Sequence, residues 1–154
     1  MKARCSIVIL CFVAFLFSCT SNAPVNQNAI NQKISSVKDC ESNKGWTWGS
    51  NGVASIGSEA GYIWDKYFAI RVIVSGELTL SYKRNNSNKA SWIQLYDESY
   101  ERISTIADIQ NSEYIKGSLG KVESGSLVNV CGFNVSVKDV MITGEHQDNS
   151  PWDF

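Results

Sequence analysis

Alternating apolar and polar positions dominate the sequence between Gly45 and Gly144. The segments YFAIRVIV (67–74) and ELTLSYK (77–83) place their apolar residues at every second position. Such alternation is typical of strands that turn one face toward a core. No stretch of this region keeps an apolar period of about 3.6 residues long enough for a helix. We therefore predict β-strands at residues 67–74, 77–83, 91–96, 102–109, 126–135 and 135–144.

Turn residues and one shift in the pattern divide these strands. RNNSNK (84–89) consists of residues that favour turns, and Gly132 is expected to mark a bend or bulge. Between residues 135 and 142 the apolar positions change parity near Lys138, which is what a β-bulge produces. About seven or eight short strands without helices predict an all-β fold, an antiparallel β-sandwich. A single helical turn is expected within ISSVKDCESNK (34–44).

The N-terminal segment MKARCSIVILCFVAFLFSC has the layout of a secretory signal peptide. Lys2 and Arg4 precede an apolar run that ends at Ser18, and this run is too short for a spanning helix. The letters LFSC resemble the bacterial lipobox, in which the cysteine receives a diacylglyceryl group and becomes the new N-terminus. The resemblance implies a lipoprotein signal peptide at 1–18 and lipidation of Cys19. The alternative is an ordinary signal peptide cleaved nearby, with Cys19 unmodified.

The residues after Cys19 are rich in Asn, Gln and Ser and contain no aromatic side chain up to residue 36. Such a segment has little apolar surface to bury, so we predict a flexible tether at 19–36 and one domain at 37–154. The lipoprotein resemblance implies attachment to a membrane of the bacterial envelope. Thr20 stands where an aspartate would indicate retention at the inner membrane. We therefore expect the outer membrane, on its periplasmic side.

Net charge argues against a nucleic-acid partner. Without residues 1–18 the chain loses Lys2 and Arg4, so that 12 basic residues face 15 acidic ones and the formal charge is −3. Nucleic-acid-binding domains need a clustered basic surface. The remaining length fits a single domain that can bury a core.

Two cysteines remain once Cys19 and the signal segment are set aside. They are Cys40 and Cys131. Outside the cytoplasm, two such cysteines most simply form one disulfide. Closing this loop would contribute about 4–5 kcal/mol in the chain-entropy model. A metal pair or two free thiols are the alternatives, although two cysteines and the single His146 make a poor zinc site.

The order of these features resembles the jelly-roll β-sandwiches of bacterial carbohydrate-binding modules. Four segments carry the resemblance: GWTWGSNGVASIG (45–57), GELTLSYKRNN (76–86), SWIQLYDES (91–99) and VSVKDVMITG (135–144). It implies a mostly non-catalytic domain whose ligand lies on an aromatic-lined face or in loops at one end. Many such modules hold a structural calcium ion. No cluster of Asp, Asn or Glu in this sequence matches a loop that would bind one, so no cofactor is assigned.

The strand SWIQLY (91–96) carries the main candidate site. Trp92, Gln94 and Tyr96 share one face, opposite the two aliphatic residues of the strand. In a hairpin with residues 77–83, these side chains would lie near Lys83 among polar neighbours. An aromatic ring can stack on the C–H face of a pyranose, and amide or ammonium groups can bind its hydroxyls.

Trp48 and Trp64 are further candidates for lining a site. Trp48 lies in a glycine-rich run, and Trp64 precedes a predicted turn at 65–66. For all of these aromatic residues, including Trp92 and Tyr96, packing in the core is the alternative.

Catalytic motifs are missing from this sequence. His146, the single histidine, lies in a polar tail without an orienting partner, and no nucleophile elbow, HExxH pair or phosphate-binding glycine loop occurs. The carboxylates Asp97, Glu98, Glu101 and Asp108 fall near predicted turns. We therefore expect no enzyme. We expect an envelope lipoprotein that binds a glycan, or alternatively a structural or accessory lipoprotein that contacts an envelope protein.

Overall fold

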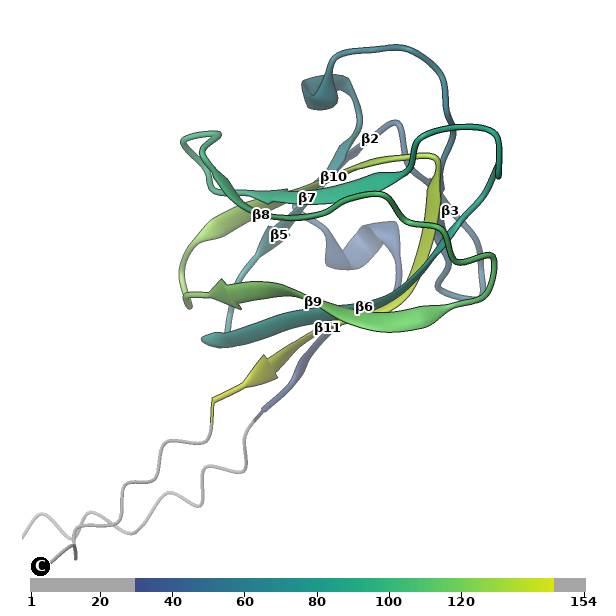
Figure 1. Cartoon of the computed structure of the whole chain (residues 1–154). Coiled ribbons are helices and arrows are strands. Elements are labelled where there is room, and N and C mark those ends of the chain that lie inside the picture. Colours follow the sequence, from purple (N-terminus) through teal and green to yellow (C-terminus); the bar gives the residue numbers. More distant parts are fainter. Residues whose placement is uncertain (1–29, 146–154) are drawn as a thin grey trace, which may run out of the picture.

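The computed structural model describes residues 30–145, which form two antiparallel β-sheets packed face to face (Figure 1). The predicted all-β sandwich is confirmed. The predicted signal peptide, Cys19 and most of the predicted tether lie outside the described residues, as does His146. No helix within residues 30–145 is long and apolar enough to cross a membrane.

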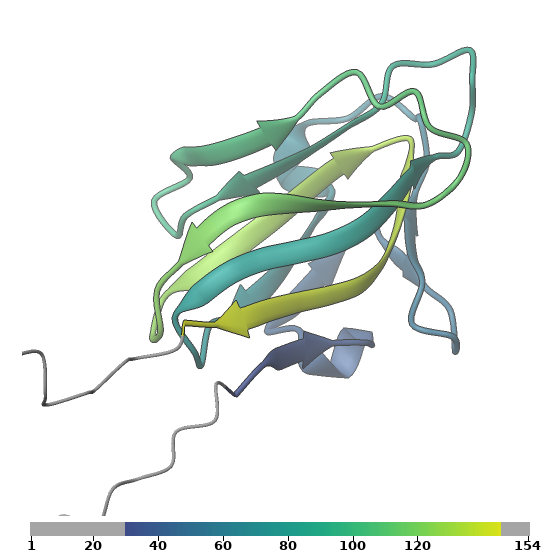
Figure 2. The same ribbon diagram turned by 60° about the horizontal axis from the view of Figure 1, so that its bottom comes forward.

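The six-stranded sheet has the order β3-β4-β11-β6-β9, with β1 also paired to β11 (Figure 2). Its strands are β1 (Gln32–Ile34), β3 (Thr47–Trp48), β4 (Ala54–Ile56), β6 (Gly76–Arg84), β9 (Ile115–Val122) and β11 (Val135–Gly144). The five-stranded sheet has the order β2-β5-β10-β7-β8. Its strands are β2 (Ser42–Lys44), β5 (Tyr67–Arg71), β10 (Leu127–Phe133), β7 (Trp92–Tyr96) and β8 (Arg102–Ile106).

Two single-turn 3-10 helices complete the described fold, η1 (Val37–Asp39) and η2 (Ile63–Asp65). The first confirms the helical turn expected within residues 34–44, and Ser36 caps it together with Asp39 in a capping box. The described residues contain 11 strands rather than about seven or eight. The additional strands are mainly the short ones near the N-terminus, whose two or three residues are too few to show an alternating pattern.

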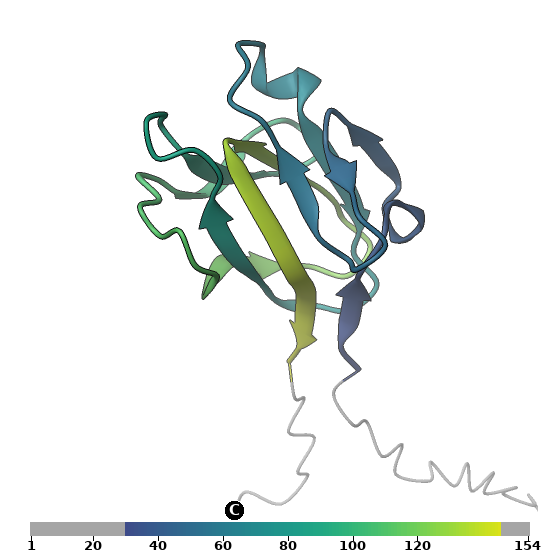
Figure 3. The same cartoon turned by 90° about the vertical axis from the view of Figure 1, so that its right-hand side faces the viewer.

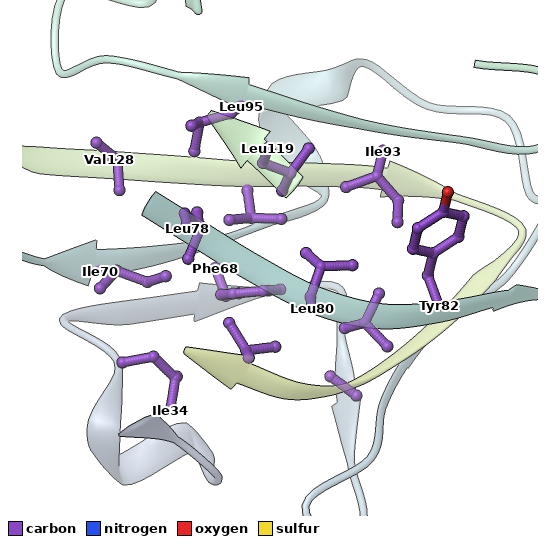
Figure 4. Close-up of a cluster of buried hydrophobic side chains, with 14 of the residues drawn as sticks. Ile34, Phe68, Ile70, Leu78, Leu80, Tyr82, Ile93, Leu95, Leu119 and Val128 are labelled. Carbon is purple, nitrogen blue, oxygen red and sulfur yellow. The ribbon is translucent and has the colours of Figure 1, made fainter. Parts of the chain in front are cut away.

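The core lies between the sheets, and the alternation seen in the sequence fills it (Figure 4). Leu78 and Leu80 of β6 point inward from one sheet, and Ile93 and Leu95 of β7 point inward from the other; all four are 0% exposed. Phe68 of β5 lies among them and is also fully buried. Each such buried side chain contributes about 1.5–3 kcal/mol of hydrophobic stabilisation.

The predicted hairpin between residues 77–83 and 91–96 is wrong. β6 belongs to the six-stranded sheet, where it pairs with β11 and β9, whereas β7 pairs with β10 and β8 in the other sheet. The chain therefore crosses from one sheet to the other after Arg84. Alternation cannot distinguish these cases, because either arrangement buries the same face of each strand.

The bend between β10 and β11 occurs at Asn134 and not at the predicted Gly132. Asn134 has a positive φ of 56° and is 1% exposed. Its amide nitrogen lies 2.8–3.3 Å from the carbonyl oxygens of Asn86, Lys89 and Ala90, and its amide oxygen accepts a 2.9 Å hydrogen bond from the Asn86 backbone. Asn134 thus holds the connection from β6 to β7 against the connection from β10 to β11.

Gly132 has a different role, inside β10. A Cβ atom at this position would lie 2.5 Å from Cζ2 of Trp46. The missing side chain therefore makes room for the Trp46 indole, which is 4% exposed and packs edge-on against Phe68 with ring centroids 5.1 Å apart. The predicted bulge near Lys138 is confirmed, since the register of β11 against β6 shifts between Lys138 and Met141.

The predicted Cys40–Cys131 disulfide is wrong, because both cysteines are free. Cys40 packs against the core cluster. Cys131 sits in β10 between the inward-facing Val130 and Gly132, so its side chain leaves the opposite face of the sheet. The five-stranded sheet therefore separates the two sulfur atoms.

The predicted tether also ends sooner than residue 36. Gln32–Ile34 pair with Val140–Ile142 as strand β1, and Ile34 is only 1% exposed (Figure 3). One apolar residue in a polar segment is a weak signal in the sequence, but here its burial adds a strand to the edge of the sheet.

Replacing Asn134 with alanine should destabilise the fold by about 2–4 kcal/mol, because backbone groups of the β6–β7 turn lose their hydrogen-bond partner and alanine disfavours a positive φ. The measurement is equilibrium urea unfolding. Asn134→Gly should cost less, since it restores backbone freedom without restoring the hydrogen bonds. The control is Asn88→Ala, because the exposed Asn88 side chain makes no hydrogen bond to the described residues. Equal stability of Asn134→Ala and the control would contradict this role.

Cys40 and Cys131 should be recovered as free thiols that alkylate slowly in the native protein. Burial raises the pKa of the Cys40 thiol to about 11 and that of the Cys131 thiol to about 12, so few thiolates are present at neutral pH. Peptide mass spectrometry without reductant measures whether the thiols are free. Alkylation before and after unfolding measures how slowly they react in the native protein. A peptide pair linked through Cys40 and Cys131 would contradict the structure.

Candidate functional site

The outer face of the five-stranded sheet gathers aromatic side chains from distant parts of the sequence. We call it the aromatic face and define it by Trp64, Tyr67, Trp92, Tyr96, Tyr100 and Phe133. Four of these residues belong to the strands β5, β7 and β10, one to η2 and one to the turn after β7. Because the sheet's inner face fills the core, the pleat directs the four strand residues outward, and η2 and the turn after β7 add Trp64 and Tyr100.

The register of β7 against β10 explains the arrangement. Trp92 pairs with Phe133, and Gln94 pairs with Cys131. Ile93 and Leu95 are fully buried in the core, so the residues beside them in β7 must face outward. The outward parity predicted for Trp92, Gln94 and Tyr96 therefore holds.

Trp92 and Phe133 form one half of the aromatic face. Their ring centroids are 6.0 Å apart and the ring planes differ by 11°, so the rings lie side by side in a stacked arrangement. Both residues are partly exposed. Nζ of Lys66 lies 5.6 Å from the Phe133 centroid and adds a positive charge above this ring. The pair thus presents an apolar surface with a hydrogen-bond donor next to it.

Trp64 organises the other half. Its ring packs edge-on against Tyr96 at 4.8 Å and against Tyr100 at 4.6 Å. Tyr96 is 6% exposed under this cover, whereas Tyr100 is 61% exposed. Tyr100 has a positive φ of 63° at the end of the turn from Asp97, which turns the chain back into β8.

The short helix η2 places Trp64 over the sheet. An ion pair of 2.7 Å joins Asp65 of this helix to Lys44 of β2. The hydrogen bond from Lys44 lowers the pKa of Asp65 and raises that of Lys44. Both groups are exposed, so this contact fixes geometry more than it adds stability.

Polar groups lie between the two aromatic clusters. The Tyr96 hydroxyl donates a 2.8 Å hydrogen bond to Oε1 of Gln94. The Gln94 amide nitrogen makes no hydrogen bond within residues 30–145 and keeps its donors free. Burial raises the pKa of Tyr96, which keeps its hydroxyl protonated as the donor to Gln94. Gln94 is therefore oriented by the protein with a free donor on the aromatic face.

Two of the predicted site residues lie elsewhere. Trp48 packs edge-on against Phe68 with centroids 5.5 Å apart and belongs to the core side of the sandwich. Lys83 lies on the outer face of the other sheet, where its Nζ is 5.0 Å from the Tyr114 ring. Lys83 is misplaced in the prediction because the hairpin assumed between β6 and β7 does not form.

Sequence reasoning missed Phe133, Tyr100 and Lys66. Phe133 lies on the same face of β10 as Cys131, and the buried Val130 lies on the other face. Alternation along 126–135 could therefore have found Phe133. Tyr100 and Lys66 lie in turns, where side-chain direction has no period. Only the folded chain brings these two residues to the sheet.

The structure assigns no metal ligands. Within residues 30–145, no group of three or more histidine, cysteine, aspartate or glutamate side chains could hold a metal ion.

Comparison with known proteins gives similarity of fold. Neither a protein-family model nor a curated protein sequence matches this chain. Among solved structures, the chain is similar to the C-terminal CBM6 of LamC, a marine laminarinase from Zobellia galactanivorans. The TM-score is 0.53 with 10% sequence identity, over 75% of this chain and 99% of that chain. The sandwich has the fold of a carbohydrate-binding module.

A second solved structure with a similar fold is a family two carbohydrate esterase from Cellvibrio japonicus. The TM-score is 0.50 with 16% identity, over 76% of this chain but only 34% of that chain. At these identities the two likenesses show the fold alone.

Proposed function

We propose that this protein is a non-catalytic carbohydrate-binding protein whose glycan lies on the aromatic face. The observation that carries the proposal is the nearly parallel, partly exposed pair of Trp92 and Phe133 beside the free amide donor of Gln94. A pyranose has an apolar C–H face and a rim of hydroxyls. Flat rings next to a fixed donor match both features.

The two aromatic clusters favour an extended saccharide over a single sugar. Trp92 and Tyr96 are four residues apart in β7, which is about 13 Å along a strand. A glycan that contacts the Trp92–Phe133 pair would therefore need more than one ring to reach Tyr100 and Trp64. Gln94 lies between them and would bind hydroxyls in the middle of such a chain.

The comparisons support this proposal at the level of fold. One similar structure is a carbohydrate-binding module, and the other is an enzyme that acts on carbohydrate. The esterase likeness covers only about a third of that enzyme, so it is no argument for catalysis here. The absence of a catalytic motif in the sequence favours the non-catalytic reading.

We also propose that a lipid on Cys19 holds the protein at the bacterial envelope, with the periplasmic side of the outer membrane as the preferred location. The two ends of the described chain support a single point of attachment. Gln32 pairs with Ile142, and the Gly144 backbone donates to Oδ1 of Asn31, so both ends leave the same corner of the sandwich. An anchor at this corner would leave the aromatic face open.

Contact with an envelope protein is the second candidate function. Tyr62, Tyr100 and Ile103 are 80%, 61% and 43% exposed, and Tyr100 belongs to the aromatic face. Large exposed apolar side chains of this kind are typical of protein interfaces. Because Tyr100 belongs to the aromatic face, a protein partner would share part of the surface proposed for the glycan.

The purified protein should bind one or more neutral oligosaccharides on a glycan array, and Trp92→Ala/Phe133→Ala should weaken that binding by about tenfold or more, because the stacking surface is lost. Calorimetric titration measures the affinity. Thermal unfolding should show little change in stability, because neither side chain is part of the core cluster.

The control is Ile73→Ala, which removes a side chain that is 67% exposed outside the aromatic face. It should bind like the parent. If the parent binds no glycan, or if the double variant binds as well as the parent, the carbohydrate proposal fails and the protein-contact alternative remains.

A further inference from the structure

A group of lysines occupies the outer face of the six-stranded sheet, on the opposite side of the sandwich from the aromatic face. Ser81 of β6 pairs with Lys116 of β9 and with Lys138 of β11. Lys83 is two residues further along β6, on the same face. We call Lys83, Lys116 and Lys138 the lysine cluster. It faces outward because the neighbouring residues Leu80 and Tyr82 of β6 face the core.

The ring of Tyr114 holds two of these ammonium groups close together. Nζ of Lys138 lies 4.5 Å from the ring centroid and Nζ of Lys83 lies 5.0 Å from it. The two charges are therefore at most about 10 Å apart, which is about one Debye length at 0.1 M salt. Burial raises the pKa of the Tyr114 hydroxyl, which agrees with a ring lying partly buried in the protein.

No carboxylate within residues 30–145 forms an ion pair with a lysine of the lysine cluster. The ion pairs in this part of the chain join Lys44 to Asp65, Arg71 to Glu41 and Lys121 to Glu145. Asp139 is close enough to raise the pKa of Tyr114, yet it forms no ion pair with any lysine of the lysine cluster.

Glu77 of β6 also lies on this outer face, but it is four residues from Ser81 and accepts a 2.6 Å hydrogen bond from Ser118. Like charges held near each other without an ion-paired carboxylate raise the local positive potential, and binding of an anion relieves their repulsion.

We propose that the lysine cluster is a second binding site, which takes carboxylate or sulfate groups of an acidic polysaccharide. Ammonium groups fixed over an aromatic ring suit such anions as point-charge donors. The choice of a polysaccharide as the carrier rests on the proposed function, whereas the choice of an anion rests on the lysines alone.

The position of the cluster disfavours the headgroups of an anchoring membrane as the anion. Lys83 pairs with Ser136, while the far ends of the same two strands, Gly76 and Gly144, meet at the corner where the described chain ends. Lys83 is seven positions after Gly76 in β6, which is about 23 Å along the strand. Ser81, which pairs with Lys116 and Lys138, is five positions after Gly76, which is about 17 Å. The lysine cluster thus lies well away from the corner that continues toward Cys19.

The test measures binding of the purified protein to polygalacturonate, which carries carboxylates, and to heparin, which carries sulfates, at low and at physiological ionic strength. Lys83→Gln/Lys116→Gln/Lys138→Gln should weaken binding to at least one polyanion by about tenfold or more and reduce its salt dependence. The corresponding triple arginine variant keeps the charges and should keep binding. Thermal unfolding of all variants verifies that they are folded.

The matched control is Lys33→Gln/Lys38→Gln/Lys89→Gln, which removes the same charge outside the cluster. It should bind like the parent, and an equal loss in the control would overturn the proposal by showing an effect of net charge. Undiminished binding by the cluster variant, or no binding of either polyanion by the parent, would also overturn it. Cluster-dependent binding only to vesicles of phosphatidylcholine and phosphatidylglycerol would overturn it in favour of a lipid surface.

The two proposed sites can fail independently. Trp92→Ala/Phe133→Ala should leave polyanion binding unchanged, because the aromatic face lies on the other sheet. Loss of polyanion binding in that variant would assign the anion to the aromatic face and overturn the lysine site. If no neutral glycan binds but lysine-dependent polyanion binding persists, the lysine site stands and the proposed function on the aromatic face fails.

Discussion

The shared apolar layer between the two sheets is the constraint on which the rest of this structure depends. Side chains along a strand alternate between its faces, so each inward residue that fills the core sends its neighbour outward. Burial of Ile93 and Leu95 directs Trp92, Gln94 and Tyr96 to one outer face, and burial of Leu80 and Tyr82 directs Ser81 and Lys83 to the other. Both proposed sites are therefore consequences of how the core is filled, and neither can move without changing it.

Rigid connections keep these two surfaces in place. Asn134 holds the turn after β6 and the start of β11 in one hydrogen-bonded unit, and the indole of Trp46 fills the space left by Gly132 in β10. These contacts set where β7 begins and how β10 lies beside it, and hence the spacing of Trp92 and Phe133. On the aromatic face itself, η2 adds Trp64 from a loop, so that surface depends on a loop as well as on strands.

A chain with two ligand-binding faces would treat neutral and acidic sugars differently. The aromatic face offers flat rings, one free amide and one ammonium group, which suit uncharged pyranose rings. The lysine cluster offers charge without a comparable stacking surface, and its attraction depends on ionic strength. A polysaccharide that contains both neutral and acidic sugars would bind to one face, or two polysaccharide chains would bind to the two faces. Attachment at the corner shared by β1 and β11 would leave both faces accessible.

The sequence by itself determined the all-β class, most of the longer strands, the bulge after Lys138 and the outward parity of Trp92, Gln94 and Tyr96, because alternation is a local property of each strand. Only the tertiary structure decided which strands are neighbours. Either sheet could accept β7 with its apolar face inward, so the sequence places Lys83 on the wrong surface and does not show that Phe133 lies beside Trp92. It also decided that a sheet lies between Cys40 and Cys131, since residues far apart in sequence meet or are kept apart only through the packing of the whole domain.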